Sequence, residues 1–394
     1  MSILPNRSRF KKLFFIIFML SIFCFTSITF SLAEDPVWWD NDWGYREQII
    51  IVNVGSSVLN NFPAYVKVPY RVGMQKNYND IRFTNADNTL LLDYEVESYD
   101  ATHANVWIRI PELTNPNVSI WMYYGNGNAY SGGNPTNVWD SNYILVQHLE
   151  ESSGIVSDST SYGNNGIPQN VEQNVLGKIN GSVRFNLDNS YIDCGNSQSL
   201  NPPVTLCLEA WANTSNNNLT AKISQKGDWD GYGIGQDKWQ GWQGHIYFQD
   251  VGKISLDWGK KLPQTNTWYY IAVTYDGVKM NLYVDGEKVA ETIVNKNPKS
   301  NNRNFYIGSD AGNQKFFKGG IDEIRMSNIS RGPDWIKQTY VMVNNNSEYV
   351  GFGGIIPKST PEKSLLKEKL PMDQISRILG LKSSKTHGGI LYEE

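Results

Sequence analysis

The chain has 394 residues, which is enough for two or three domains, and its 35 Lys and Arg residues nearly balance 39 Asp and Glu residues. The small acidic excess argues against nucleic acids and anionic lipid surfaces as partners. Tryptophan and tyrosine are frequent, with 13 and 22 residues, so we expect aromatic cores to supply much of the stability.

The first 33 residues have the layout of a secretory signal peptide. Four basic residues at 7–12 precede an apolar run at 13–30, and Ser31 and Ala33 then provide small residues for cleavage. A retained membrane anchor is the alternative, because the run is nearly long enough to span a bilayer. Cleavage leaves 31 Lys and Arg against 39 Asp and Glu, a net charge of about −8. No later segment is apolar enough to span a membrane, so we predict a secreted or cell-surface protein.

Two cysteines, Cys194 and Cys207, remain after this leader, 13 residues apart in predicted strands. The spacing does not fix the Cα–Cα distance that a disulfide requires. A disulfide and two separate core thiols therefore both stay open.

The first part of the chain contains short alternating runs of apolar and polar residues, which predict antiparallel strands. Val106, Ile108 and Ile110 share one face of such a strand and Arg109 lies on the other, so one face is expected to meet water. The turn-rich stretch 125–135 predicts a domain boundary. The expected strands cover 48–54, 64–68, 80–83, 90–97, 105–110 and 119–124.

The second part continues this pattern, and no helical periodicity is evident between residues 38 and 353. Its clearest signal is two Asp-Gly pairs, 276–277 and 285–286, flanked by alternating apolar residues, which predict two consecutive hairpins. The expected strands cover 143–150, 182–185, 191–194, 205–212, 232–235, 245–249, 268–275, 280–284, 305–307 and 321–326.

The pattern divides the chain into a first domain at 38–135, a second domain at 140–353, and a linker and tail at 354–394. Within the tail, 371–381 could form one short amphipathic helix with a proline near its N-terminus. Alone, a helix of this length is marginal in water, so a tail that docks on the body or on a partner is the other interpretation.

Several segments of the second domain occur in the order found in laminin-G-like, concanavalin A-like lectin/glucanase domains, which this part resembles. They are VQHLEESSGIVSDSTSYGNNG (146–166), LEAWAN (208–213), TWYYIAVTYDGVKMNLYVDG (267–286), NFYIGSD (304–310) and GGIDEIRMSNISR (319–331). The resemblance implies a jelly-roll sandwich of about a dozen antiparallel strands.

The first domain resembles a β-rich family of unknown function that precedes such domains in archaeal and bacterial surface proteins. The matching segments are WGYREQIIIVN (43–53), DIRFTNADNTLLLDYEVE (80–97), ANVWIRIP (104–111) and IWMYYGN (120–126). Together the two resemblances imply an all-β protein of two antiparallel sandwiches, the second a concanavalin A-like jelly roll, with a short tail that can be helical.

Catalysis by paired carboxylates requires alternate positions on one strand, so that both groups flank the scissile bond. In the second domain Asp322 and Glu323 are adjacent and are expected on opposite faces. In the first domain Asp93, Glu95 and Glu97 do alternate, and we interpret them as a solvated face. For His148 and His245, each in an alternating strand, we expect packed or solvent-facing side chains. The sequence therefore predicts no catalytic residues.

A calcium site is the metal site that the resemblance implies, because many related domains bind one structural Ca²⁺. Asp158 opens a loop rich in oxygen-bearing side chains and glycines, which suits Ca²⁺. The expected ligands are Asp158, Asn164, Asn165 and Asp322. The alternative is an ordinary Asx-rich turn with a separate surface Asp. Zinc is not expected, since no His/Cys cluster has ligand spacing.

A sugar site is predicted in 228–245, which combines aromatic rings with amide and carboxylate side chains. Rings stack on the C–H face of a pyranose, and polar groups fix its hydroxyls. Trp239 and Trp242 flank a predicted hairpin loop, although they could instead cover the sandwich edge or pack on the neighbouring domain. The expected ligand-binding residues are Trp229, Tyr232, Trp239, Gln240 and Trp242.

The leading hypothesis is a carbohydrate-binding or adhesive surface protein without catalytic activity, whose partners are glycans or cell-envelope polysaccharide. A glycan-active hydrolase or lyase on the same fold is the first alternative. The second is a structural cell-envelope protein that binds surface proteins. No nucleic-acid partner is expected, nor a membrane span after signal cleavage.

Overall fold

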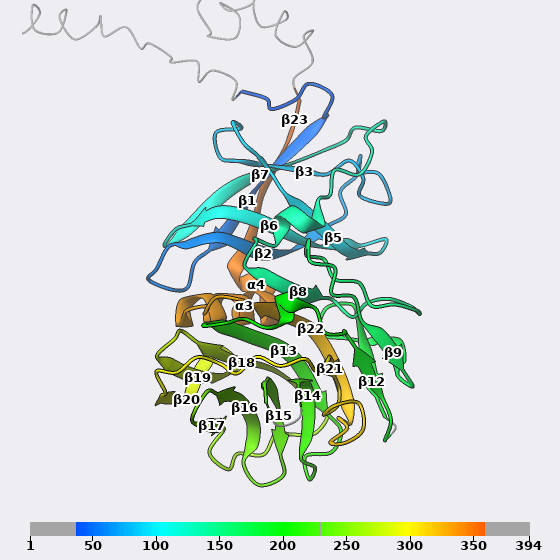
Figure 1. Ribbon diagram of the computed structural model, residues 1–394. Coiled ribbons are helices and arrows are strands. Elements are labelled where there is room, and N and C mark those ends of the chain that lie inside the picture. Colours follow the sequence, from blue (N-terminus) through cyan, green and yellow to red (C-terminus); the bar gives the residue numbers. More distant parts are fainter. Residues whose placement is uncertain (1–36, 187, 228–229, 359–394) are drawn as a thin grey trace, which may run out of the picture. The chain divides into compact units, whose positions relative to one another are not determined.

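The computed structural model describes residues 37–358 except 187 and 228–229. From residue 39 onward, the described residues form one compact unit that contains two β-sandwiches (Figure 1). The predicted signal peptide (1–33) and tail helix (371–381) lie outside the described residues. Within the described part of the chain, no helix has the length and hydrophobicity needed to cross a bilayer.

The first sandwich consists of two antiparallel sheets whose inner faces share one hydrophobic core. Val106, Ile108 and Ile110 are buried in it, as their alternation predicts. The larger sheet has the order β23-β1-β7-β3-β4 and contains β1 (Tyr45–Val52), β3 (Arg82–Asn85), β4 (Leu91–Leu92), β7 (Asn117–Tyr124) and β23 (Val350–Pro357). The smaller sheet has the order β2-β6-β5 and contains β2 (Leu59–Pro69), β5 (Tyr94–Tyr99) and β6 (His103–Leu113).

The second sandwich has an inner sheet that faces the first sandwich and an outer sheet of seven strands. The inner sheet runs β10-β11-β22-β13-β18-β19-β20, with β8 also paired to β22. Its strands are β8 (Tyr143–Gln147), β10 (Glu172–Leu176), β11 (Gly181–Phe185), β13 (Leu206–Thr214), β18 (Trp268–Tyr275), β19 (Lys279–Val284), β20 (Glu287–Ile293) and β22 (Gly319–Ser327). The outer sheet runs β17-β16-β15-β14-β21-β12-β9. Its strands are β9 (Ile167–Gln169), β12 (Tyr191–Asp193), β14 (Ala221–Lys226), β15 (Tyr232–Asp237), β16 (Gly241–Phe248), β17 (Gly252–Asp257) and β21 (Phe305–Ile307).

The predicted meander is present as the consecutive antiparallel pairs β18–β19 and β19–β20. At the second turn Asp285 and Gly286 both have positive φ, 52° and 76°, as an Asp-Gly hairpin turn requires. Cys194 and Cys207 are separate buried thiols, which settles the alternative that the sequence left open.

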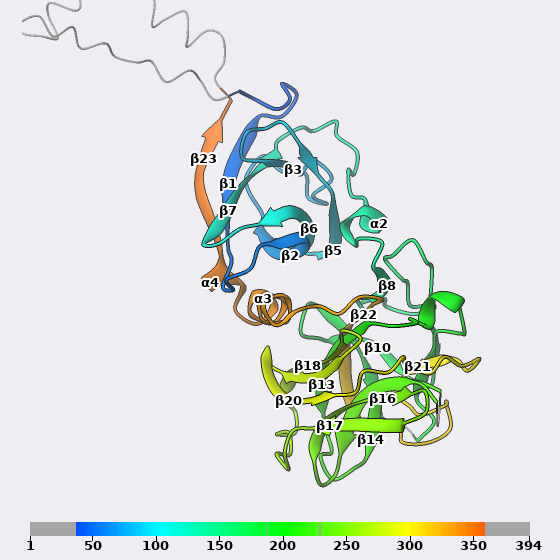
Figure 2. The same ribbon diagram turned by 60° about the vertical axis from the view of Figure 1, so that its left-hand side comes forward.

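The C-terminal part of the described chain returns to the first sandwich, which the sequence did not predict. β23 pairs with β1, so the expected domain end at residue 353 falls inside a strand of the first sandwich. Helix α3 (Pro333–Asn344) and the short α4 (Asn346–Tyr349) precede β23. In Figure 2, α3 lies between the two sandwiches. Two further short helices, α2 (Pro135–Val138) and the 3₁₀ helix η1 (Gln198–Leu200), lie in connections.

Aromatic rings on α3 contact both sandwiches. Trp335 packs 4.9 Å from Phe62 of β2, and Tyr340 stacks 5.7 Å from Trp211 of β13 (ring centroids). One hydrophobic cluster accordingly includes core residues of the first sandwich together with Trp211 and Tyr270 of the inner sheet. Because this part of the interface is apolar and continuous with a core, it helps to hold the two sandwiches as one body.

The helix is therefore expected to carry much of the stability of this joint. Replacing Trp335, which is 6% exposed, by Ala should lower the free energy of unfolding by about 3–5 kcal/mol, because a large cavity is left. Trp239→Ala is the matched control: that side chain is 68% exposed and should cost no more than about 0.5 kcal/mol. Chemical denaturation followed by far-UV circular dichroism measures both, and equal effects would contradict this role of α3.

Candidate functional site

The aromatic residues predicted to bind sugar do not share one surface. Trp239 is exposed in the turn between β15 and β16, with Lys238 Nζ 5.2 Å from its ring centroid. Trp242 is fully buried within β16, and Tyr232 is buried while donating its hydroxyl to Leu200 O at 2.7 Å. The expectation that Tyr232 and Trp242 present their rings to a ligand is therefore wrong. The hairpin turn is shorter than predicted, so Trp242 falls in the strand and packs in the core.

The predicted sugar segment also covers both ends of β15, which are far apart. Asp230 precedes β15 and Trp239 follows it, with the six residues of the strand between them. At about 3.3 Å per residue, the strand separates these ends by roughly 20 Å. Gln240 stays beside Trp239, where its backbone N–H donates to Asp237 Oδ1 at 3.1 Å. Trp229 lies outside the described residues.

Three of the residues predicted to hold calcium, Asp158, Asn164 and Asn165, are hydrogen-bonded within their own loop and to β8, whereas Asp322 Oδ1 is buried without a hydrogen-bond partner among the described residues. Asp158 accepts hydrogen bonds from the backbone N–H groups of Val146, Thr160 and Asn164 at 2.8–3.0 Å. Asn165 Oδ1 accepts the N–H of Asp158 at 2.8 Å, and Asn164 Nδ2 donates to Ile144 O at 2.6 Å. The loop is thus an Asx-organised turn.

The fourth predicted ligand, Asp322, is on β22 and accepts the N–H groups of Lys178 and Ile179 at 2.7 and 3.0 Å. It is fully buried and shares no hydrogen-bond partner with Asp158 among the described residues. Three of the four predicted calcium ligands are thus held within the Asx turn, and calcium binding by these residues stays a prediction.

A buried cluster of charged side chains lies where β5 of the first sandwich meets β8 and β22 of the second. His148, which follows β8, is at its centre: Nδ1 lies 2.7 Å from Glu323 Oε1, and Nε2 lies 3.3 Å from Glu95 Oε2. Glu97 Oε2 lies 3.4 Å from His148 Nδ1. Two tryptophans complete it, since Trp107 Nε1 donates to Glu97 and Trp139 Nε1 donates to Glu95, both at 2.7 Å.

Arg325 supplies the second cationic group of this cluster. It hydrogen-bonds Glu323, and its Nη1 lies 3.7 Å from Glu209 Oε1. Its guanidinium also lies over the rings of Trp107 and Trp139, 4.2 and 5.1 Å from their centroids. Such contacts suit arginine, whose planar cation both bonds carboxylates and stacks on aromatic rings.

Two irregularities in the strands bring these carboxylates together, and they explain why the sequence patterns misled. Glu323 has a positive φ of 51° within a register shift of β22 against β13, so the simple alternation with Asp322 is broken. Glu97 lies in a second register shift, between β5 and β6. Glu95 and Glu97 were predicted to be solvated, but both are buried because the second sandwich covers this face.

The electrostatics of the cluster assign different protonation states to its carboxyl groups. Burial, reinforced by the nearby Glu323, raises the pKa of Glu97 well above its usual value. For Glu95 and Glu323, burial acts in the same direction, but His148 outweighs it and their pKa values are lowered. Burial would lower the pKa of His148, yet the surrounding glutamates raise it well above its usual value. The cluster therefore pairs ionised Glu95 and Glu323 with a protonated histidine and Arg325.

This cluster contains the one group of potential metal ligands among the described residues, namely Glu97, His148 and Glu323, whose ligand atoms lie within 4.8 Å of one another. A metal needs a neutral histidine, whereas His148 is protonated here. Glu97 also accepts Trp107, and Glu323 is paired with Arg325. The arrangement therefore suits an internal ion network that joins two domains better than a metal centre.

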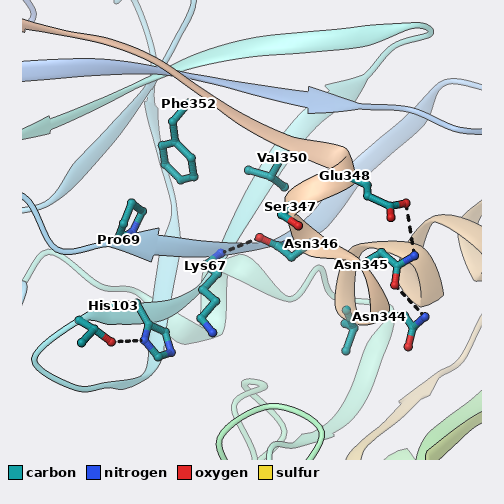
Figure 3. Close-up of a pocket in the computed structure, with 12 residues that line it drawn as sticks. Lys67, Pro69, His103, Asn344, Asn345, Asn346, Ser347, Glu348, Val350 and Phe352 are labelled. Atoms are coloured by element: carbon teal, nitrogen blue, oxygen red, sulfur yellow. Dashed lines mark hydrogen bonds between the residues drawn. The ribbon is translucent and has the colours of Figure 1, made fainter.

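A surface pocket with a volume of about 740 Å³ lies at the first sandwich where α3, α4 and β23 meet the ends of β2 and β6 (Figure 3). Asn346, on its wall, accepts the N–H of Lys67 at 3.2 Å and donates to Tyr65 O at 2.8 Å. His103 Nδ1 lies 2.9 Å from Thr102 Oγ1. Several polar side chains of this pocket thus form hydrogen bonds within the protein, which fix the local conformation of the chain.

A second pocket lies on the rim of the second sandwich, with a volume of about 390 Å³. Three connections build it: η1 and the residue after it, the β14–β15 loop, and the β20–β21 loop. We call it the rim pocket, and its lining residues are Gln198, Asn201, Asp230, Ser300, Asn301, Asn302 and Arg303. Every one of them is polar.

Asn301 organises the rim pocket. Its backbone N–H donates to Asn201 Oδ1 at 3.2 Å, its side-chain amide donates to Asp230 O, and its Oδ1 accepts the N–H of Arg303 at 2.9 Å. Arg303 Nε lies 3.5 Å from Asp230 Oδ1. Gln198 and Asn302 make no side-chain hydrogen bond to any described residue, so their amides remain able to bind a ligand.

Comparisons with known proteins confirm the predicted family resemblances. Residues 186–337 match the concanavalin A-like lectin/glucanases superfamily, and residues 77–166 match a domain of unknown function (DUF2341). The second sandwich is thus a concanavalin A-like domain. The DUF2341 match extends past the first sandwich and includes Glu95, Glu97 and His148 of the charged cluster. No curated protein is similar enough to this chain to match it.

Solved structures are similar to about half of this chain, at low sequence identity. The binding domain of Paraclostridial Mosquitocidal Protein 1 is 16% identical, with a TM-score of 0.44 over 52% of this chain and 53% of that one. Domain 4 of AbnA, an extracellular arabinanase from Geobacillus stearothermophilus in complex with arabinotriose, is 16% identical, with a TM-score of 0.41 over 50% and 97%. The botulinum neurotoxin serotype D ligand binding domain in complex with N-acetylneuraminic acid is 15% identical, with a TM-score of 0.41 over 50% of each chain. The chain thus spans about half of the two toxin domains, and the likeness concerns fold alone.

The assigned protonation states predict unequal effects of two similar substitutions. Glu97→Gln should change the free energy of unfolding by less than about 1 kcal/mol, because the amide resembles the neutral carboxyl group already present. Glu323→Gln should cost about 3–5 kcal/mol, because it leaves His148 and Arg325 without their closest negative charge. Urea denaturation at neutral pH measures both, and a larger loss in Glu97→Gln would contradict the assignment.

The same shifts predict how stability depends on pH. The lowered pKa values of Glu95 and Glu323 stabilise the folded state above pH 4.5, and this contribution is lost as pH falls through their folded values. The raised pKa of His148 stabilises the fold below pH 6.5, and this contribution is lost at higher pH; the raised pKa of Glu97 costs stability from pH 4.5 upward. The melting temperature should therefore be highest near pH 4.5 and decline above it, less steeply in Glu97→Gln. Scanning calorimetry across this range tests both statements.

Proposed function

We propose that this protein is a secreted or cell-surface carbohydrate-binding protein without catalytic activity, and that the rim pocket is its ligand site. The observation that carries the proposal is the lining of this pocket: amide, hydroxyl, carboxylate and guanidinium groups converge there from three connections. Sugar hydroxyls donate and accept hydrogen bonds at once, and amides match them because they carry both kinds of group.

The rim pocket suits a ligand better than the larger pocket of Figure 3. In the larger pocket, Asn346 binds the backbone of β2 and α3, and Asn345 Nδ2 donates to Glu348 at 3.3 Å. In the rim pocket, Asn301 is held by hydrogen bonds to its neighbours, whereas the side chains of Gln198 and Asn302 form no hydrogen bond with any described residue. Ordered walls with free amides are what selective binding of a polyhydroxylated ligand requires.

The absence of catalysis is part of the proposal and is supported by where the carboxylates lie. Glu95, Glu97 and Glu323 form the densest group of carboxyl side chains described above, but they are buried between the sandwiches. A glycosidic bond must lie between its two catalytic carboxyl groups, and these are covered by Trp107, Trp139 and their neighbours. Release of reducing sugar from polysaccharide by the purified chain would overturn this part of the proposal.

The first experiment is a glycan-array screen of the mature chain, with and without Ca²⁺. We expect binding to defined glycans, and at least a tenfold weaker affinity in the double variant Gln198→Ala/Asn302→Ala, because two free amides are removed (about 1.4 kcal/mol corresponds to a factor of ten). Both side chains are at the surface, so the melting temperature should not change.

Trp239→Ala serves as the control, because this ring lies at the opposite end of β15 from the rim pocket. Loss of binding in Trp239→Ala with full binding in the double variant would move the site to the β15–β16 turn. A folded protein that binds no glycan in either condition would instead favour a structural role with protein partners.

A further inference from the structure

The outer face of the seven-stranded sheet is basic, and the strand register places its residues. Gln225, Gly233 and His245 are paired across β14, β15 and β16, so they share one face. Lys222 shares it too, because it pairs with Gly235, two residues beyond Gly233. The intervening residues, such as Ile234, point into the sandwich core.

Glycines on β15 let the neighbouring side chains approach each other on this face. A Cβ added at Gly233 would lie 2.8 Å from Gln225 Oε1 and 3.0 Å from His245 Cε1. The strand therefore has no side chain here, and Gln225 and His245 lie over it from both sides. Lys253 of β17 reaches the same face, because it pairs with Tyr247, two residues from His245.

Positive charge gathers on this face with little to oppose it. Lys222 is 5% exposed, and no carboxylate of the described residues forms an ion pair with it. The carboxylates near it bind other groups: Asp310 Oδ2 pairs with Lys315 at 2.6 Å, although Asp310 Oδ1 has no hydrogen-bond partner among the described residues, and Asp237 accepts the hydroxyl of Thr220 at 3.0 Å. Burial, with the nearby Lys253, lowers the pKa of Lys222 to about 7, and an anion beside it would favour its charged form.

Two polar atoms on this face are also buried without a hydrogen-bond partner. They are His245 Nδ1, on a side chain that is 1% exposed, and Gln225 Oε1. Buried polar atoms of this kind are rare in native proteins and call for an explanation such as a bound ion or ligand. Burial lowers the pKa of His245 well below its usual value, and Lys222, Lys253 and Lys315 lower it further. An anion on this face would relieve that repulsion.

We propose that the basic face, at Lys222 and His245, binds the carboxylate or sulfate group of an acidic saccharide. The saccharide part rests on the proposed carbohydrate-binding function, whereas the anion site stands on the geometry of the sheet. The face and the rim pocket are close along the chain, since β15 begins at Tyr232, two residues after Asp230 of the rim pocket. One extended acidic oligosaccharide can thus occupy both.

The test compares three small probes, inorganic sulfate, glucuronate and glucose, by isothermal titration calorimetry on the full mature chain. Wild-type protein should bind sulfate and glucuronate, and Lys222→Met should weaken both at least tenfold. Lys288→Met is the matched control, because Lys288 is an exposed lysine on β20 of the other sheet, where it pairs with Glu291. It should leave binding within twofold of wild type.

A second measurement locates the bound sulfate without relying on Lys222→Met. Sulfate should shift a histidine side-chain resonance that is missing in His245→Gln, and four histidines are few enough to assign. Absence of sulfate and glucuronate binding by folded wild type, or equal affinity in Lys222→Met, overturns the proposal. Binding of sulfate without glucuronate keeps the anion site but overturns its saccharide ligand.

The outcome is separable from that of the proposed function. If the rim pocket binds neutral glycans, the double variant Gln198→Ala/Asn302→Ala loses them while Lys222→Met keeps them. If the rim pocket binds nothing, the anion site is still judged by the response of sulfate and glucuronate to Lys222→Met.

Discussion

The buried guanidinium of Arg325 is the constraint on which the joint between the two sandwiches depends. An arginine cannot shed its charge in a protein, so its surroundings must supply negative charge. Glu323 and Glu209 do so from the inner sheet, and Trp107 and Trp139 cover the cation from the first sandwich and its connection to β8. His148 Nδ1 lies 2.7 Å from Glu323 Oε1, and the Nε2 of the same ring pairs with Glu95 of β5. Each sandwich thus completes the charge balance of the other.

This arrangement has a structural consequence beyond the cluster itself. A buried ion network adds little net stability, but breaking it leaves an unpaired charge, so it disfavours other orientations of the two sandwiches. Helix α3 adds the apolar part of the joint, and β23 returns the chain to pair with β1. The outer sheet and the rim pocket, on the other layer of the second sandwich, remain uncovered by this joint. The joint with the first sandwich therefore leaves free the layer that we propose binds ligand.

Much of the fold follows from local sequence. The Asp-Gly turn at 285–286 and the alternation at Val106, Ile108 and Ile110 both give the observed structure, because each depends only on neighbouring residues. The site was harder to predict, because it depends on contacts that local patterns do not contain. Glu95 and Glu97 alternate as a solvated pair would, and only the second sandwich makes their face buried. Glu323 adopts a left-handed backbone that favours glycine, so its sequence gives no sign of the bulge that turns it toward His148.

At the basic face, by contrast, the sequence does contain an informative local pattern, which the overall composition of the segment does not reveal. Residues 231–235 place glycine at every second position, and in a strand such a pattern leaves one face without side chains while Tyr232 and Ile234 fill the core. The pattern suggests close approach of neighbours over that face, but not which neighbours approach. That required the register, which sets Gln225 and His245 on either side of Gly233. The aromatic residues of 228–245 suggested sugar stacking, but Trp242 lies in the core. The features of this segment that bear on binding are instead the glycines, which leave room on the outer face, and Asp230, which lines the rim pocket.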